Sequence, residues 1–476
     1  MINIFKKKSL DSVLNNNNSK NGLKKTFTTF DLIFFGIGSV IGSGVFSITG
    51  LVASKYAGSA IVISYLIAGV SSIFIGLIYA ELASMIPASG SLYSYSYVVL
   101  GEIIAFVALA IMFLEIGCAG SFVSSACADY FHKILDQLNI NFPVFLKKTP
   151  FEGGVVNFIA VLIILFLGFV LYLGNVVSKS LNIILVIIKM STIFAFILIA
   201  SKYFNAQILF DNFNPFGFKN VFAGSAVLFF AFNGYANLTS TVEECKNPKK
   251  SLTIAIIVAM LTAIVVYSLV SIALTGMIDI KILNSSIGAL SLALKYHGNS
   301  WGASLIATGA ICGMITVTLM NIFSISRIFY VAAQDGMFFN ICSRIHPKYK
   351  TPSSSIIWLT LILSLMAGFI PPALLAQTSS FAMLFNAIIA ILLVVIARFT
   401  HKNVRRPFKT PFLYLMSLCS VGLIFYLLID QIYPKVTFQS LFVGTVACLM
   451  VIIYIVLKTV KIMKLSITKK QSKILD

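Results

Sequence analysis

Long hydrophobic runs separated by short polar segments dominate the chain. A helix needs about 20 residues to cross a bilayer, and each helix satisfies its own backbone in lipid. The runs lack the strict alternation of a membrane β-barrel. The pattern therefore predicts an all-α integral membrane protein with twelve transmembrane helices. These lie at residues 30–53, 58–86, 101–131, 153–174, 181–201, 221–241, 251–276, 300–331, 354–371, 378–398, 411–430 and 438–458.

Glycines interrupt two of these runs at matching places. Gly42, Ser43 and Gly44 lie inside the first run, and Asn233 and Gly234 lie inside the sixth. If ten runs form two sets of five, the second set begins on the opposite side of the membrane, so the two sets are inverted repeats. The predicted organisation is a cytosolic tail, two five-helix repeats, a final helix pair and a second cytosolic tail, at residues 1–27, 28–202, 203–398, 399–458 and 459–476.

An interrupted helix leaves backbone groups that need partners inside a membrane. The N–H groups at Gly42, Ser43 and Gly44, together with the dipole of the helix that follows, suit a carboxylate. The carbonyls that end the preceding helix suit an ammonium. The same glycines also fit a small-residue face for close helix packing, and the segment alone favours neither interpretation. At the second interruption, Phe232 is a candidate lid over a ligand, with ordinary aromatic packing as the alternative.

Lys189 lies near the middle of the fifth run, where an ammonium costs roughly 3 kcal/mol on insertion scales. Residues of this kind usually face the protein interior and serve an ion or proton pathway. One interpretation is a structural cation paired with Glu115. We prefer a proton-carrying role beside the first interruption, because a desolvated lysine can gain and lose a proton.

Two carboxylates also fall inside hydrophobic runs. Glu115 is midway along the third run and is a candidate partner for a cationic substrate group or a proton relay, with a structural pair as the alternative. Glu81 is close to the end of the second run, where its side chain is expected to reach water.

The composition supports the membrane assignment and orients the chain. Of 476 residues, 59% are hydrophobic and 11% are charged, which is too apolar for a soluble protein of this length. With the N-terminus inside, 25 Lys and Arg residues fall on the cytosolic side and 9 on the other, as the positive-inside rule requires. Both termini are therefore expected in the cytosol. The net charge of +20 reflects this distribution, so nucleic acid is not an expected partner.

Several other classes of protein are not expected. The seven cysteines show no CxxC spacing and the four histidines fall in predicted loops, so no metal site or disulfide framework is predicted. No nucleotide-binding motif or buried nucleophile is present, and we expect no cofactor, no catalytic residue and no enzymatic activity. The first 27 residues are polar and no cleavage site follows them, so no cleavable signal peptide is expected.

The chain resembles the amino acid–polyamine–organocation (APC) superfamily, most closely the bacterial relatives of the cationic amino acid transporters. The resemblance covers nearly all of residues 25–460. It rests on residues 36–46, 79–93, 114–115, 243–248 and 327–336. It implies a LeuT-like fold with a 5+5 inverted repeat, broken helices 1 and 6, and transport by alternating access.

The resemblance also implies roles for individual residues. In the family, the first break holds the substrate carboxylate, carbonyls at both breaks hold its amino group, and a lysine in helix 5 stands where related proteins bind sodium. The matching positions are Gly42, Ser43 and Gly44 for the carboxylate, Val40, Ile41, Phe230 and Phe232 for the amino group, Glu115, Asn233 and Phe232 for the side-chain pocket, and Lys189 with Thr316 for proton coupling.

Of two departures from the family pattern, the first bears on the substrate and the second concerns the cytosolic surface. Asn233 and Ala236 stand where the related transporters usually have isoleucine and aspartate, and Gln334 replaces an arginine. Glu115 favours a cationic or broad range of amino acids, whereas Asn233 favours a polar neutral one. We expect a proton-coupled amino acid symporter of the plasma membrane, with amino acids, protons and lipid as its partners. The alternatives are an amino acid/product antiporter and a membrane amino acid sensor.

Overall fold

The computed structural model describes residues 6–10, 12–13, 23–137, 139–140, 142–283 and 288–432. Within these ranges the regular structure is helical, apart from one isolated parallel bridge between Phe27 and Cys245. The predicted twelfth helix (438–458), the predicted C-terminal tail (459–476), Cys448 and most of the predicted N-terminal tail lie outside the described residues.

The first predicted helix consists of two pieces joined by an irregular segment. Helix α2 (Thr29–Val40) begins at a capping box, in which Thr28 and Asp31 bond each other's backbone N–H groups. It ends where Ile41 takes an extended conformation, with φ −82° and ψ 102°. After residues 41–43 the chain continues as a π-helical turn (Gly44–Ile48), α3 (Thr49–Val52) and a second π-helical turn (Ala53–Ala57). The interruption expected at Gly42 is therefore present.

Most of the remaining helices follow the hydrophobic runs, and four short ones (92–99, 206–211, 280–283 and 289–296) lie between the predicted runs. In the first part of the chain they are α4 (Ile61–Met85), α5 (Leu92–Val99), α6 (Glu102–Met112), a π-helical turn (Phe113–Gly117), α7 (Cys118–Gln137), α8 (Phe158–Tyr172), α9 (Asn175–Ser201) and α10 (Ala206–Asp211). In the second part they are α11 (Phe218–Phe229), α12 (Tyr235–Thr239), α13 (Pro248–Met277), α14 (Ile280–Leu283), α15 (Ala289–Tyr296), α16 (Ser300–Gln334), α17 (Ser353–Phe369), α18 (Pro372–Thr400) and α19 (Leu413–Ile432). His132, expected in a loop, lies in α7.

The second interruption separates α11 from α12. A 3₁₀ turn (Phe230–Phe232) ends α11, and Asn233 is extended, with φ −64° and ψ 132°. Gly234 has φ +152°, which side chains rarely tolerate. A Cβ atom at Gly234 would also lie 2.9 Å from the carbonyl carbon of Ser39. Glycine is thus required both for the turn and for the close approach of α2.

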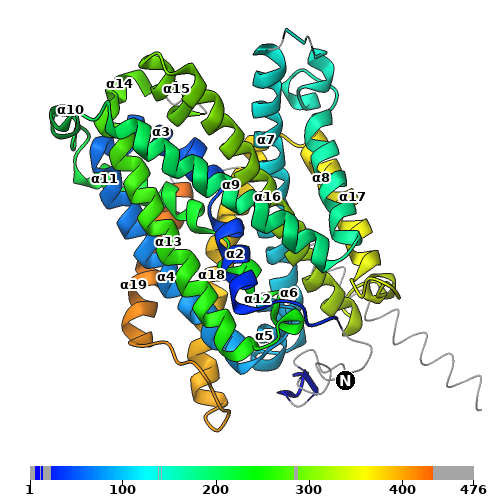
Figure 1. Cartoon of the computed structure of the whole chain (residues 1–476). Helices are drawn as coiled ribbons and strands as arrows, with labels where there is room; N and C mark the ends of the chain where they lie inside the picture. Colours follow the sequence, from blue (N-terminus) through cyan, green and yellow to red (C-terminus); the bar gives the residue numbers. More distant parts are fainter. Residues whose placement is uncertain are drawn as a thin grey trace, which may run out of the picture.

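The two interrupted helices lie at the centre of the bundle. Helix α2 packs against the longer helices α9, α13 and α16 and the short α12, and Figure 1 shows it among them. The segment after the first interruption also meets the end of α11, because a Cβ atom at Gly44 would lie 2.5 Å from the Cβ atom of Ala231. Helices α7, α8 and α17 form a neighbouring group that projects beyond α16 (Figure 1).

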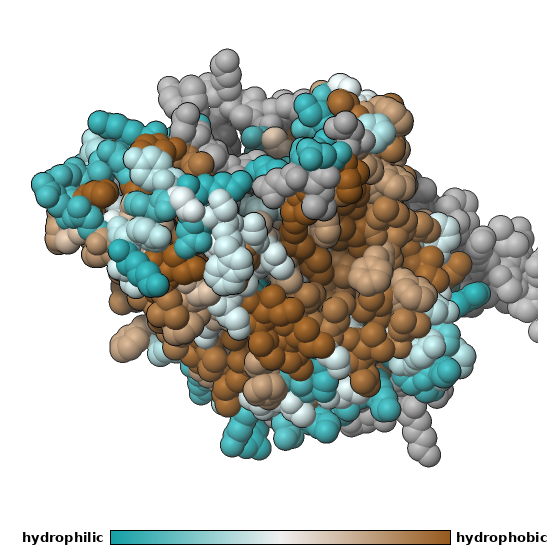
Figure 2. Space-filling view, turned by 45° about the horizontal axis from the view of Figure 1, so that its top comes forward, coloured by the Kyte–Doolittle hydropathy of each residue, from teal (hydrophilic) through white to brown (hydrophobic). Residues whose placement is uncertain are grey.

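The outer surface suits a lipid environment. Seven helical stretches of the described chain are long and apolar enough to cross a membrane, and three shorter apolar helices accompany them. Large apolar side chains such as Phe166, Phe194 and Val265 point outward. Figure 2 shows a broad hydrophobic area on one face, with hydrophilic residues gathered towards its edges. Contact with lipid explains this exposure, which would be unusual for a protein in water.

Candidate functional site

Lys189 reaches from α9 into the end of α2. Its ammonium lies 3.1 Å from the carbonyl oxygen of Ile37, 3.2 Å from that of Gly38 and 2.6 Å from that of Ile41. The Thr316 hydroxyl, from α16, is a fourth neighbour at 3.0 Å. The side chain is fully buried. A cation at a helix C-terminus compensates both the unpaired carbonyls and the helix dipole. The tertiary structure thus brings Lys189 and Thr316 together at the first interruption.

Lys189 and Glu115 do not form the ion pair that we considered. The Glu115 carboxylate accepts a hydrogen bond from the Asn386 amide on α18 and interacts with the Asn233 side chain. No ion pair within the described part of the chain involves Glu115. The pairing is excluded because backbone carbonyls, rather than a carboxylate, surround the ammonium.

Tyr267 of α13 connects the two interruptions. Its hydroxyl oxygen lies 2.9 Å from the carbonyl oxygen of Val40 and 3.0 Å from that of Ala231. The hydroxyl therefore occupies acceptors at both breaks. The sequence analysis missed this residue, because a tyrosine within a long hydrophobic helix gives no signal that its hydroxyl meets two helix ends.

A small cavity of about 30 Å³ lies beside the first interruption. Gly42, Ser43 and Gly44 line it, so the proposed carboxylate position faces a hollow. A volume of this size holds about one or two water molecules. The other lining residues come from α2, α7, the second interruption and α16, and are Ser39, Val40, Ala119, Val123, Phe230, Ala231, Asn233, Val317 and Asn321.

Three polar side chains form a buried group next to this cavity. The Asn237 amide donates to the Ser39 hydroxyl at 2.7 Å and to the side-chain oxygen of Asn321 at 2.9 Å. Ser39 and Asn321 also line the cavity. The sequence analysis did not select them. Asn237 and Asn321 each lie inside a predicted hydrophobic run, which could have indicated a polar contact between helices, because buried amides require hydrogen-bond partners.

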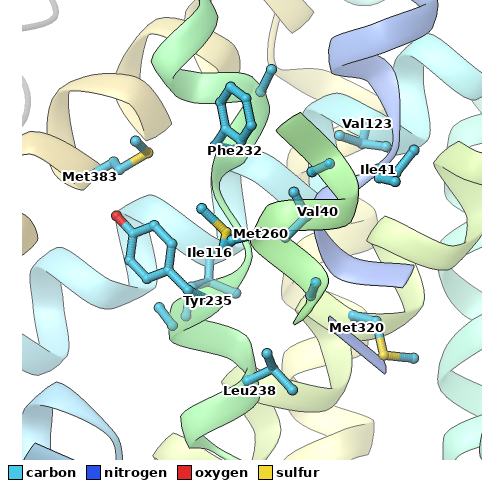
Figure 3. Close-up of a cluster of buried hydrophobic side chains, with 14 of the residues drawn as sticks. Val40, Ile41, Ile116, Val123, Phe232, Tyr235, Leu238, Met260, Met320 and Met383 are labelled. Carbon is cyan, nitrogen blue, oxygen red and sulfur yellow. The ribbon is translucent and has the colours of Figure 1, made fainter. Parts of the chain in front are cut away.

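Phe232 does not cover the cavity in this structure. Its ring is fully buried and packs against Tyr65 and Tyr267, at centroid distances of 6.3 and 5.0 Å. Figure 3 shows Phe232 on the interrupted segment, with Val40, Ile41 and Val123 to one side of it and Met383 to the other. Phe230 lines the cavity instead. The expected lid therefore belongs to an aromatic cluster.

The carbonyls assigned to a substrate amino group are largely occupied. Tyr267 donates to Val40, Lys189 donates to Ile41, and the backbone N–H of Asn233 donates to the carbonyl of Phe230 at 3.1 Å. A carbonyl oxygen has two lone pairs, so a ligand's ammonium at any of these three carbonyls would share the acceptor with a protein donor or replace that donor.

Glu81 is buried rather than in contact with water. It is 1% exposed and accepts two hydrogen bonds from Arg398, at 3.0 and 2.8 Å, and one from the backbone N–H of Thr410. The expectation of a solvated carboxylate was wrong because Arg398 and the loop before α19 close over the end of α4. Glu81 thus joins α4 to α18.

A second cluster of charged residues lies near the start of α2. Arg327 and Glu244 are fully buried and form an ion pair at 3.3 Å. Nearby, Glu243 accepts a hydrogen bond from the backbone N–H of Ser89, and burial raises the pKa of Glu243 to about 7. Lys8 pairs with Asp335 at 2.6 Å. These contacts tie the segment before α2 to the ends of α12 and α16.

The described residues contain no group of three or more His, Cys, Asp or Glu side chains arranged to hold a metal ion. The cysteines they include are free, and most of them are buried. The polar chemistry around the interruptions consists of backbone groups, hydroxyls, amides, the Lys189 ammonium and the Glu115 carboxylate beside Asn233.

Comparisons with known proteins identify the family. A family model described as "Amino acid permease" matches residues 27–457. The methylthioribose transporter of Bacillus subtilis is 35% identical over 92% of this chain and 95% of its own. The branched-chain amino acid permease BcaP of B. subtilis is 34% identical, covering 86% and 88% of the two chains. The mouse cationic amino acid transporter 4 is 33% identical, covering 81% and 62%. The chain therefore belongs to the amino acid permease family of the APC superfamily and is a multi-pass membrane transporter, not an enzyme.

Proposed function

We propose that this protein is an amino acid permease of the plasma membrane that couples uptake to protons by alternating access. The proposal includes a LeuT-like arrangement of twelve transmembrane helices, with five-helix repeats at 28–202 and 203–398 and both termini in the cytosol. The supporting observation is the contact between the Lys189 ammonium and the end of interrupted helix α2. Because this ammonium lies at the proposed substrate-binding break, the protonation of Lys189 can be coupled to the binding of the substrate.

The proposed coupling uses contacts at the first interruption. While protonated, Lys189 holds the carbonyls of Gly38 and Ile41 and fixes the end of α2. The substrate binds best while Lys189 is protonated, because the ordered break then presents its N–H groups to the carboxylate. Loss of the proton to the cytosol loosens the end of α2 and releases the substrate there, so proton and substrate move in the same direction. The substrate carboxylate binds the N–H groups at Ser43 and Gly44, where the dipole of the following helix favours an anion. Tyr267, shared between Val40 and Ala231, must release both acceptors as the two breaks separate.

The Lys189→Ala variant tests this coupling in proteoliposomes. We expect accumulation driven by a pH gradient to fall at least about tenfold, which is an ordinary size for coupling between two sites. Exchange of labelled for unlabelled substrate, which needs no gradient, should persist. Lys202→Ala is the matched control, because Lys202 is exposed at the end of the same helix. Undiminished gradient-driven accumulation by Lys189→Ala would exclude the proton role. Exchange without any proton movement in the unaltered protein would instead identify an antiporter.

A second candidate substrate comes from one relative. The B. subtilis protein that matches over 92% of this chain is named a methylthioribose transporter. A thiosugar lacks the amino and carboxyl groups that the two interruptions suit. Including methylthioribose in the same uptake assay separates the candidates, because its transport without amino acid transport would contradict an amino acid permease.

A further inference from the structure

A large second cavity lies next to the small one. Its volume is about 610 Å³, and Phe230 lines both cavities. The large cavity is bounded by the segment after the first break, by α11 and by the first turns of α18. By the orientation proposed above, this is the extracellular half of the bundle. A ligand that begins at the small cavity can therefore extend past Phe230 into the larger one.

The two cavities differ in chemistry. The small one presents backbone groups with hydroxyl and amide side chains, including Ser43, Asn233 and Asn321. The large one is mainly hydrophobic, and its polar side chains are those of Gln377 and Ser380. Its apolar lining comes from six elements and consists of Ile48, Leu51, Phe122, Ala226, Val227, Phe229, Phe230, Ala376, Phe381, Met383 and Leu384.

No charged side chain among the described residues lines either cavity. Glu115 is the carboxylate that the sequence suggests as a partner for a cationic substrate group. It is 2% exposed, however, and its hydrogen-bond partners are the amides of Asn386 and Asn233. Asn233, which lines the small cavity, therefore stands between that cavity and Glu115 as a hydrogen-bond partner. A cationic side chain would have to displace these amides to reach the carboxylate. Elsewhere in the two cavities it would lose its hydration without gaining a counter-charge.

We infer that the substrates are neutral amino acids with apolar side chains, whose polar end binds at the first interruption while the side chain lies against the large cavity. The inference rests on the proposed function. It differs from the sequence-based expectation, in which Glu115 favoured cationic or a broad range of amino acids. Burial of apolar surface favours side chains that fill the large cavity. Phe230 must turn aside to admit them, because its ring stands at the junction.

A competition assay in proteoliposomes tests the substrate class. Methionine, leucine and isoleucine should compete for labelled-substrate uptake at least about tenfold better than lysine, arginine or ornithine, because an uncompensated charge is poorly accepted by an apolar cavity. Equal or better competition by the cationic amino acids would overturn the inference and leave the permease function intact. Transport of no amino acid at all would overturn the proposed function itself.

A pair of variants tests the role of the large cavity. Ala376→Phe fills part of it, whereas Ala373→Phe adds the same ring one turn earlier on α18, at an exposed position outside the lining. We expect Ala376→Phe to weaken competition by methionine and leucine relative to alanine and glycine, by about tenfold. Ala373→Phe should leave these ratios unchanged. An equal loss for large and small substrates with Ala376→Phe would show that the cavity does not hold the side chain.

Discussion

Single residues determine how closely the two interrupted helices approach. Gly234 has φ +152° and lies close to Ser39 and Val40. The turn therefore requires the backbone freedom of glycine, and the close approach of α2 requires the absence of a side chain. Gly44 shares only the close approach, because a Cβ atom there would lie 2.5 Å from the Cβ atom of Ala231. The two interpretations of the first break, a ligand site and close helix packing, are therefore compatible. The backbone is unwound there, and the glycines also let the helices touch.

The substitution Gly234→Ala should destabilise the protein by about 1–3 kcal/mol, the usual cost of an unfavourable backbone conformation. The new Cβ atom would also lie 2.8 Å from a methyl group of Val40, so α2 must shift. Thermal unfolding in detergent measures the change. The control is Gly422→Ala, since a Cβ atom at Gly422 in α19 meets nothing within 4 Å. That control should be neutral or stabilising, by up to about 1 kcal/mol. Equal behaviour of the two variants would contradict a special role for Gly234.

At the scale of elements, buried charges hold helix ends together. Arg327 on α16 binds Glu244, which follows α12, and donates to Asn175 at the start of α9 at 2.9 Å. Its guanidinium also lies 3.6 Å from the centre of the Phe323 ring. The backbone carbonyl of Glu244 accepts hydrogen bonds from Thr26 and Phe27. One ion pair therefore links three helices with the segment that enters α2.

Removing one partner of this pair should be strongly destabilising. We expect Arg327→Ala to cost about 3–5 kcal/mol, because it leaves the Glu244 carboxylate buried without a counter-charge. Lys147→Ala breaks a more exposed pair with Asp136 and should change stability by about 0–1 kcal/mol. Thermal unfolding of both variants gives the comparison. A loss below 1 kcal/mol for Arg327→Ala would mean that Glu244 finds another partner.

At the scale of the whole molecule, the apolar outer surface and the distribution of basic residues both fit a protein that lies in a membrane. Exposed apolar residues form the outer faces of helices such as α8, α9 and α13. The basic residues gather in loops that the positive-inside rule assigns to the cytosol. The orientation that we propose puts the loop before α19 inside the cell and the loop before α8 outside.

Single cysteines test this orientation. In a cysteine-free background, Lys402→Cys lies in the loop before α19 and Lys148→Cys in the loop before α8. On intact cells, an impermeant maleimide should label Lys148→Cys and leave Lys402→Cys unlabelled until the cells are opened. The reverse labelling would invert the proposed topology and assign the large cavity to the cytosolic side.

Much of the fold follows from local pattern. Hydrophobic runs of sufficient length must be helical in lipid, so the long described helices fall where the runs are, whereas α5, α10, α14 and α15 lie between the runs. Both interruptions were predictable, because glycine within an apolar run weakens the helix where the backbone must serve another purpose. Most of the polar N-terminal tail and the predicted twelfth helix lie outside the described residues.

Partners across the bundle were less predictable, because contacts between distant segments depend on how the helices pack. We expected the Glu81 side chain to reach water, but Arg398, which is more than 300 residues further along the chain, binds and covers it. Tyr267 gave no sequence signal because its function depends on two carbonyls that only packing brings together.

The sequence alone determined the helical membrane class, the two breaks and the depth of Lys189, because each depends on the order of apolar, glycine and charged residues along one segment. The tertiary structure alone decided which groups those residues meet. In it, Lys189 donates to backbone carbonyls of α2 and Glu115 accepts from Asn386. The described residues that line the cavity beyond Phe230 include no charged side chain. The physical reason is that a buried charge requires a partner, but its identity depends on which helices lie within hydrogen-bonding distance.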